Sequence, residues 1–456
     1  MSGRPWAVFG AAAAGTFLGA LDLNVVPVAF DDITRSFPHA TLGALSWVTT
    51  GYAVAFGAAL LPAGALADRL GRRAVFLIGL SLFTLASACC ALAGGVGMLI
   101  AARFVQGVGA GTMTPLALAL ILPAFGAAAR GRAIGLWSAV GALAAAAGPA
   151  VGGLLVGADG WRLVFWFTVP LGAVAVAVGW RVLPRVDDGR DGPGRLPDLL
   201  GAALLAAAVG AAALGLASGG DWGWTSPATL GTLGAAVALS VGFGLRTARI
   251  ADPLIRPGLL RLRPVRVANV ALLLFGLLYF ALQLANALFL TSVWDYTALQ
   301  AGLALTPGAV VATAASYVGG PAGARYGNRV IAQVSVLLFG AGCLMLALGT
   351  GPGSGYVTGF LPGLLVSSVG SSAAFSVLAA AAVESVPAAE LGIGSALSVT
   401  SRAIGASLGF AGLAALLASP AGGALAGYHR AWWIVAVGTV VTAVAATSIR
   451  RPAPTA

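Results

Sequence analysis

Long apolar runs, separated by short polar segments, follow one another along the whole chain. Each run is close to the roughly 20 residues that a helix needs to cross the hydrocarbon core of a bilayer. Their number predicts fourteen membrane-spanning helices. We expect these spans near residues 6–30, 44–66, 74–95, 98–123, 132–157, 163–182, 197–218, 226–247, 266–293, 299–323, 328–350, 354–381, 394–418 and 428–448.

The composition is that of a membrane protein. Of the 456 residues, 59% are hydrophobic and 9% are charged, and the mean hydropathy is +0.96. Soluble domains carry about 25% charged residues, so a soluble fold is excluded. The first apolar run is too long for the core of a signal peptide, and we expect it to remain as the first span. The three cysteines lack metal-ligand spacing, so we predict no metal site.

The arginines test the number of spans, because all 25 basic residues are arginine. With fourteen spans and a cytoplasmic N-terminus, twenty of them fall on the inner side. Only Arg35, Arg162 and Arg430 fall outside, while Arg103 and Arg402 lie within spans. This is the positive-inside distribution of membrane proteins, and one span more or fewer would destroy it. We therefore predict that both termini are cytoplasmic and that the net charge of +11 faces anionic lipid, with no role in nucleic-acid binding.

One carboxylate, Asp22, lies in the middle of the first apolar run. Placing an aspartate at the centre of a membrane helix costs about 2.5–3.5 kcal/mol, so such a residue faces a bundle interior or a water-filled cavity and marks an ion pathway. Carboxyl groups removed from water also keep their protons to higher pH. We hypothesise that Asp22 carries the proton of a transporter, with Arg103 as its electrostatic partner. The alternatives are an aspartate near the interface and a snorkelling Arg103.

Polar and aromatic residues within the spans are candidates for a substrate cavity. In the ninth span, Tyr279, Gln283 and Asn286 follow one another at i, i+4 and i+7, which places them on one helix face. Such a stripe faces either a cavity or a neighbouring helix that it bonds to. The full set of predicted cavity residues is Asn24, Trp47, Tyr52, Gln106, Tyr279, Gln283 and Asn286.

The loop after the second span reads GALADRLGRR, residues 64–73. It resembles the signature loop of the major facilitator superfamily, and its glycines permit close helix approach and a tight turn. A plain positively charged inner loop is the alternative. The resemblance implies a cytoplasmic gate made by Gly64, Asp68, Arg69, Gly71, Arg72 and Arg73.

A second copy of this loop indicates an internal repeat. The segment GPAGARYGNR, residues 320–329, aligns with residues 64–73 at an offset of 256 residues. Duplicated six-helix halves with a site between them are a known architecture of transporters. We therefore predict that both halves of the chain share one plan, and the alternative is a chance match of four positions in two basic turns.

Two further spans carry motifs. The fourth span, IAARFVQGVGAGTMTP, resembles the superfamily motif whose intramembrane arginine is implied to take part in proton coupling, which here is Arg103. The fifth span, GALAAAAGPAVGGLL, is similar to the motif of antiporter branches, implied to form a pivot that prevents leakage. A generic close-packing glycine face is the alternative. The pivot residues are Gly141, Gly148, Pro149, Gly152 and Gly153.

The resemblance covers nearly the whole chain and is to the fourteen-span drug:proton antiporter family of the major facilitator superfamily. It departs from the family pattern at residues 123–133, PAFGAAARGRA, which lack the usual acids. The implied fold is all-α and integral to the membrane, with a six-helix bundle at 1–182, a linker with two additional helices at 183–265, and a second six-helix bundle at 266–456. We expect the two additional helices to pack outside the transport path.

The implied function is the export of lipophilic small molecules, driven by protons, across the bacterial cytoplasmic membrane. The resemblance implies alternating access by a monomer in contact with lipid, with the proton as coupling ion and no cofactor. A carrier for another solute, such as a lipid, siderophore or metabolite, is the alternative in the same fold. A membrane sensor or enzyme lacks the groups it needs, because both histidines fall in predicted outer loops and Asp22 is the one acid well inside a span.

Overall fold

The protein is almost entirely helical. The computed structural model describes residues 4–125, 130–184, 198–250, 253, 257–353, 355–386, 391–418 and 423–447. The first half contains α1 (Arg4–Ser36), α2 (Leu42–Leu70), α3 (Arg72–Ala91), α4 (Val96–Ala124), α5 (Arg130–Asp159), α6 (Trp161–Val182), α7 (Leu199–Trp222) and α8 (Pro227–Arg249). The second half contains α9 (Pro257–Arg261), α10 (Arg263–Ser292), α11 (Ala298–Tyr326), α12 (Asn328–Gly349), the π-turn η2 (Tyr356–Phe360), α13 (Leu361–Val383), α14 (Leu391–Leu417) and α15 (Gly423–Ala446).

Within the described ranges, fourteen helices are long and two elements, α9 and η2, are short. By their described residues, thirteen of the long helices are also apolar enough to cross a membrane. The remaining long helix is α5. The predicted all-α membrane fold is thus confirmed. The predicted spans coincide with the helices to within a few residues at most ends, because a span needs about 20 apolar residues whatever its neighbours are.

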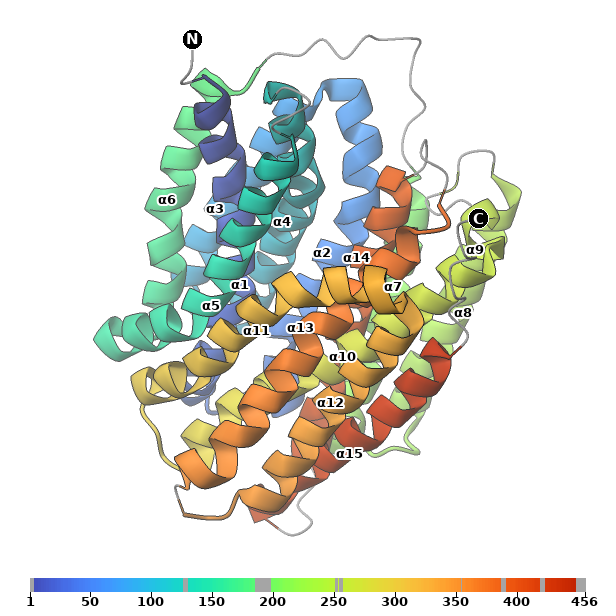
Figure 1. Ribbon diagram of the computed structural model, residues 1–456. Helices are drawn as coiled ribbons and strands as arrows, with labels where there is room; N and C mark the ends of the chain where they lie inside the picture. The colour runs from blue at the N-terminus through green and yellow to red at the C-terminus, as the bar shows by residue number, and fades with distance from the viewer. Residues whose placement is uncertain are drawn as a thin grey trace.

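The long helices form two bundles and one additional pair, α7 and α8. Helices α1–α6 pack together, and so do α10–α15 (Figure 1). The additional pair is arranged asymmetrically, because α7 packs against both α2 and α14 whereas α8 packs against α7. Apolar side chains of α8 are widely exposed, as expected for a helix that faces lipid.

The internal repeat appears in the backbone. Gly71 connects α2 to α3 with φ 87° and ψ 136°, and Gly327 connects α11 to α12 with φ 92° and ψ 131°. These two glycines are the residues that the 256-residue offset aligns. Positive φ angles favour glycine because it has no β-carbon, so the same tight turn is specified twice. At Gly64, in contrast, no described atom lies within 4 Å of an added β-carbon, so the close helix approach predicted there is not seen.

The two bundles meet mainly along two helix pairs, α2–α14 and α5–α11, with a smaller contact of α1 against α10 and α11. In the pair α2–α14, the Thr400 hydroxyl donates a hydrogen bond of 3.4 Å to the carbonyl oxygen of Gly57. In the pair α5–α11, a β-carbon added at Gly153 would overlap the carbonyl oxygen of Ala298. One added at Gly302 would overlap the carbonyl oxygen of Pro149. The backbones of α5 and α11 therefore touch directly, and the two helices diverge away from this contact (Figure 1).

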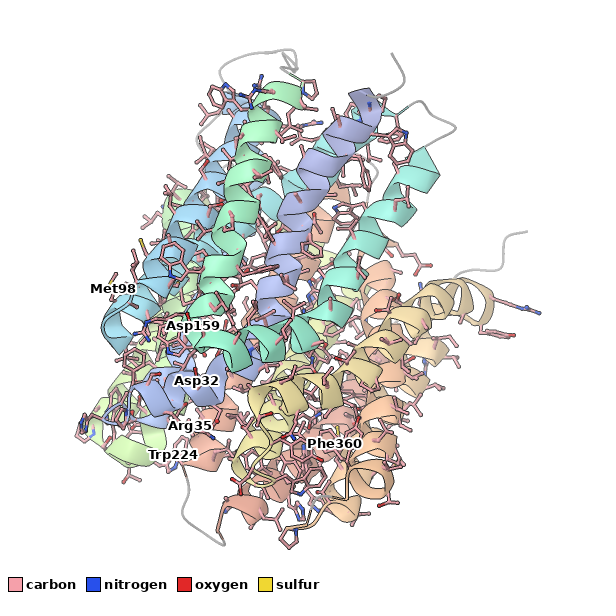
Figure 2. The ribbon with its side chains drawn as sticks, turned by 90° about the vertical axis from the view of Figure 1, so that its left-hand side faces the viewer. Asp32, Arg35, Met98, Asp159, Trp224 and Phe360 are labelled. Carbon is pink, nitrogen blue, oxygen red and sulfur yellow. The ribbon has the colours of Figure 1, made fainter. Side chains whose placement is uncertain are left out.

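The contact between α5 and α11 lies toward the end of the molecule where α1 finishes. Figure 2 shows Asp32, Arg35 and Asp159 at this end. The Asp32 carboxylate accepts a 2.8 Å hydrogen bond from the backbone N–H of Trp161, which fixes the end of α1 to the start of α6. The predicted orientation makes this the outer side of the membrane. In that orientation the backbone contact between the two bundles lies on the outer side.

Candidate functional site

A buried ion pair joins α1 to α4. One guanidinium nitrogen of Arg103, Nη1, lies 2.7 Å from Asp22 Oδ2 and 2.9 Å from Oδ1. Asp22 is 2% exposed and Arg103 is 1% exposed. Helix α1 continues to Ser36, which at 1.5 Å per residue is about 20 Å beyond Asp22, so Asp22 lies well inside the helix. The structure thus places Arg103 beside Asp22, inside the N-terminal bundle.

Neutral groups complete the surroundings of the ion pair. Gln106 accepts a 2.6 Å hydrogen bond from Arg103 and donates one of 3.2 Å to Asp22, because it lies one turn after Arg103 on the same face of α4. Arg103 Nε donates to the carbonyl oxygen of Val48 at 2.9 Å. The ring of Tyr52 covers the guanidinium group, with the guanidinium carbon 4.3 Å from the ring centroid. Each charge therefore has its counter-charge and several hydrogen bonds, as a buried pair requires.

This arrangement makes proton binding and packing interdependent. A proton on Asp22 would remove the negative charge, and the buried guanidinium of Arg103 would lose its partner. Removing one partner of a buried ion pair costs about 3–5 kcal/mol. The network is therefore suited to change its contacts when Asp22 gains or loses a proton.

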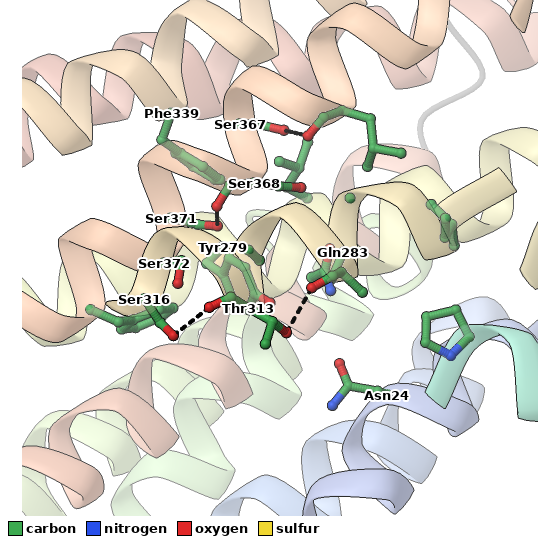
Figure 3. A pocket seen from close by; sticks show the side chains of 18 of the residues that line it. Asn24, Tyr279, Gln283, Thr313, Ser316, Phe339, Ser367, Ser368, Ser371 and Ser372 are labelled. Carbon is green, nitrogen blue, oxygen red and sulfur yellow. Dashed lines mark hydrogen bonds between the residues drawn. The ribbon is translucent and has the colours of Figure 1, made fainter. Parts of the chain in front are cut away.

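A cavity of about 280 Å³ lies between the two bundles. Helix α1 contributes Asn24 and α5 contributes Pro149, while most of the lining comes from α10, α11 and α13. Figure 3 shows Asn24 on one side of the cavity and a group of serines on the other. The described lining residues include no charged side chain and none from α7 or α8. The α13 serines are Ser367, Ser368, Ser371, Ser372 and Ser376.

Three of the seven predicted cavity residues line this cavity, namely Asn24, Tyr279 and Gln283. The other four lie elsewhere. Gln106 and Tyr52 surround the ion pair, as described above.

Trp47 and Asn286 make contacts outside the cavity. Trp47 stacks on Phe104 with ring centroids 5.9 Å apart, on the side of α2 that α7 covers. Asn286 accepts a 3.0 Å hydrogen bond from the indole N–H of Trp432 on α15. The polar stripe on α10 thus serves both of the roles left open for it, a cavity wall and a helix-to-helix hydrogen bond.

The predicted pivot residues of α5 divide between two neighbours. Gly148 and Gly152 face α1 within the same bundle, where added β-carbons would press on Asn24 and Val25. Pro149 and Gly153 face α11 in the other bundle. Gly141, nearer the other end of α5, has ordinary contact with Thr16 at 3.8 Å.

The predicted gate residues fall at the turn between α2 and α3. Arg73 donates a hydrogen bond to the carbonyl oxygen of Trp180 and lies over the indole ring, 5.7 Å from its centroid, so it joins α3 to the end of α6. Gly71 forms the turn. The side chains of Asp68 and Arg69 lie outside the described ones, and Arg72 is half-buried.

The serine wall of the cavity was not predicted, although the sequence carries a signal for it. Residues 366–376 read VSSVGSSAAFS, with five serines within a single span. Spacing of this kind places most of the hydroxyl groups on one side of a helix. That these hydroxyl groups point toward a cavity could not be predicted without the positions of α10 and α11.

Two helical bundles around a central cavity, with a buried ion pair beside it, define the class of secondary transporters. A family profile described as Major Facilitator Superfamily matches residues 12–410. The chain belongs to the major facilitator superfamily. It is a membrane transporter and not an enzyme.

The curated relatives of the chain include proteins named for export and drug resistance. It is 32% identical to the tetracenomycin C resistance and export protein of Streptomyces glaucescens, over 92% of this chain and 78% of the relative. It is 34% identical to the multidrug resistance protein Stp of Mycobacterium tuberculosis (strain CDC 1551 / Oshkosh), over 89% of this chain and 74% of the relative. The crystal structure of a bacterial homologue of the human lysosomal transporter Spinster shares the fold, with a TM-score of 0.67 and 17% identity over the whole of both chains. The chain is thus related to drug and antibiotic efflux proteins.

The ion pair predicts a specific pattern of stability. Arg103→Leu should destabilise the protein by about 3–5 kcal/mol, because it leaves the carboxylate of Asp22 buried without its counter-charge. Adding Asp22→Asn should recover part of this loss, since the unpaired charge is then gone. Melting temperatures of the detergent-solubilised single and double variants measure both effects.

A surface ion pair supplies the control. Arg35 pairs with Asp31 at 2.8 Å, but its side chain is 68% exposed, so Arg35→Leu should cost at most about 1 kcal/mol. A double variant no more stable than Arg103→Leu alone would contradict the pairing.

Proposed function

We propose that the chain is a proton-coupled antiporter that exports lipophilic small molecules of the drug or antibiotic type across the cytoplasmic membrane of a bacterium. The main support for this proposal is the set of contacts made by one short segment of α1. Asp22 holds the ion pair, Asn24 lines the cavity, and Asn24 and Val25 pack against the glycines of α5. Within four residues, α1 therefore links the proton site, the cavity and the helix that touches the other bundle.

The proposed cycle alternates between two open states. In the state closed to the outside, Asp22 is ionised and Arg103 holds it, and solute enters the cavity from the cytoplasm. After the bundles open outward, solute leaves and Asp22 takes up a proton. Return to the inward state releases the proton and restores the ion pair. Coupling follows because proton and solute bias the same two-state equilibrium in opposite directions.

The kind of solute is proposed from the relatives. Their names record resistance to several drugs and the export of tetracenomycin C. The cavity of about 280 Å³ suits a small organic molecule, with Phe339 and Phe375 for apolar contact and serine hydroxyls for hydrogen bonds. No nucleotide is needed, because the proton gradient supplies the energy.

Transport by the purified full-length protein in proteoliposomes tests the proposal. With an imposed pH gradient, tetracenomycin C should move in the direction opposite to the proton. Collapse of the gradient by nigericin should reduce the accumulated amount at least about tenfold, since a tenfold ratio corresponds to one pH unit, or about 1.4 kcal/mol. Movement of the solute in the same direction as the proton would contradict export, and accumulation that survives nigericin would contradict proton coupling.

A further inference from the structure

Arg402 is a second arginine deep within the helices, and the ion pair does not involve it. It lies near the middle of α14 (Leu391–Leu417). Its guanidinium carbon lies 5.5 Å from the centroid of the Phe375 ring, and Tyr279 is the titratable group that faces it. Among the described residues, no hydrogen bond or ion pair reaches its side chain. Arg103, by comparison, has a carboxylate, a glutamine and a backbone carbonyl as partners.

A cation in these surroundings lacks its counter-charge. Charged side chains within a membrane protein pair with one another or face water, because an isolated charge is costly there. An aromatic face offsets only part of this cost. The side chain of Arg402 is half-buried and lies against Phe375, whose ring lines the cavity. The structure therefore offers an anion a place beside Arg402.

Arg402 stands directly behind one wall of the cavity. Phe375 and Tyr279 both line the cavity, and their ring centroids are 5.0 Å apart in an edge-to-face arrangement. Phe375 thus contacts both the cavity and the guanidinium group. Ser376, which follows Phe375 in α13, and Ser316 of α11 also line the cavity, and Figure 3 labels Ser316.

The described charged groups near the cavity sum to a positive charge, because Arg402 has no counter-charge among them. The cavity's described lining contains hydroxyl, amide and aromatic groups but no carboxylate, and the nearby acid Asp22 is neutralised by Arg103. Serine and threonine hydroxyls donate or accept hydrogen bonds, so they do not select the sign of a solute's charge. Arg402 does select it, because charges interact more strongly in the low dielectric of a protein interior than in water.

We propose that the cavity takes a solute with several oxygen groups and one anionic group, a carboxylate or a phenolate, placed toward Arg402. A lipophilic cation fits this charge balance poorly. The inference deepens the proposed function by naming the class of cargo. Binding in the cavity requires no proton gradient, so the inference can be tested apart from transport.

Matched aromatic probes test the charge preference. Full-length protein in nanodiscs is titrated at neutral pH with fluorescent 3-hydroxy-2-naphthoate, with its neutral amide 3-hydroxy-2-naphthamide, and with the cation ethidium. We expect the acid to bind about tenfold more tightly than the amide, corresponding to about 1.4 kcal/mol for one partly desolvated charge pair. Ethidium should bind more weakly than both.

Variants assign the preference to one side chain. Arg402→Gln should bring the ratio of acid to amide affinity close to one, whereas Arg402→Lys should retain most of it. Arg249→Gln, at the exposed end of α8, is the matched control and should leave the ratio unchanged. Ser371→Ala should weaken acid and amide alike, because its hydroxyl does not discriminate charge.

Several results would overturn the inference: equal affinity for acid and amide, tightest binding of ethidium, or an unchanged ratio in Arg402→Gln. Absence of measurable binding by all three probes would also overturn it. If Arg402→Gln does not fold, the wild-type ratio and Arg402→Lys still decide. A protein that prefers the acid in nanodiscs but moves no solute against a pH gradient would refute the proposed antiport and leave the inference intact.

Discussion

Asp22→Asn is expected to abolish pH-driven transport while the protein remains folded in the membrane. Asparagine has nearly the same shape and can still accept a hydrogen bond from Arg103, but it cannot exchange a proton. Proton entry would then no longer bias the two open states, so uphill accumulation should fall to the level of protein-free liposomes. Exchange of labelled for unlabelled solute across the liposome membrane should continue, because it needs only alternating access.

The same substitution elsewhere in α1 provides the control for Asp22→Asn. Asp31 lies nine residues further along α1 and pairs with the exposed Arg35. Asp31→Asn should leave accumulation within about twofold of the unmodified protein, since exposed ion pairs contribute little. Uphill accumulation by Asp22→Asn at the normal rate would remove Asp22 from the proposed coupling site and direct attention to another titratable group.

The partner of Asp22 could be predicted from the sequence because the physics allows few alternatives. A carboxylate deep in the membrane needs a cation or water, and Arg103 was one of two arginines available within the spans. The close approach of both side chains then follows from packing α1 against α4. The third member, Gln106, was predicted for the cavity instead. Periodicity places a side chain on a helix face but does not say which neighbour that face meets.

The helices could be predicted for a related reason, whereas their ends were less certain. The first span was expected to finish near residue 30, yet α1 runs to Ser36. Its last two turns contain Asp31 and Asp32, which lower the hydropathy, but Asp32 accepts a hydrogen bond from the backbone of Trp161 and so this end of the helix has a packing partner. Contacts of this kind link residues more than a hundred positions apart, and local hydropathy carries no information about them.

The fifth span shows that the sequence also predicts helix packing only in part. A stripe of small residues predicts close approach by another helix, but not how many helices approach. In the structure α5 has two close neighbours, with Gly152 against α1 and Gly153 against α11. Adjacent residues on a helix point about 100° apart, so a double glycine is the simplest way to bring two backbones near the same turn.

Gly153→Val is expected to weaken closure of the outer side. A β-carbon at residue 153 would overlap the carbonyl oxygen of Ala298, and backbone atoms cannot move aside as a flexible side chain can. Overpacking of this kind costs about 1–3 kcal/mol. Because the clash exists only where α5 touches α11, the cost should shift the population toward the outward-open state by about five- to 150-fold.

Accessibility of the cavity from outside measures this shift. Asn24→Cys, in a background with the three native cysteines replaced by alanine, places a thiol in the cavity wall. A membrane-impermeant maleimide added from outside should label it faster when Gly153→Val is present. Gly157→Val is the matched control one turn further on, where an added β-carbon lies 3.8 Å from that of Leu299 and fits without a clash. Equal labelling rates in the two valine variants would mean that the backbone contact between α5 and α11 does not hold the outer side closed.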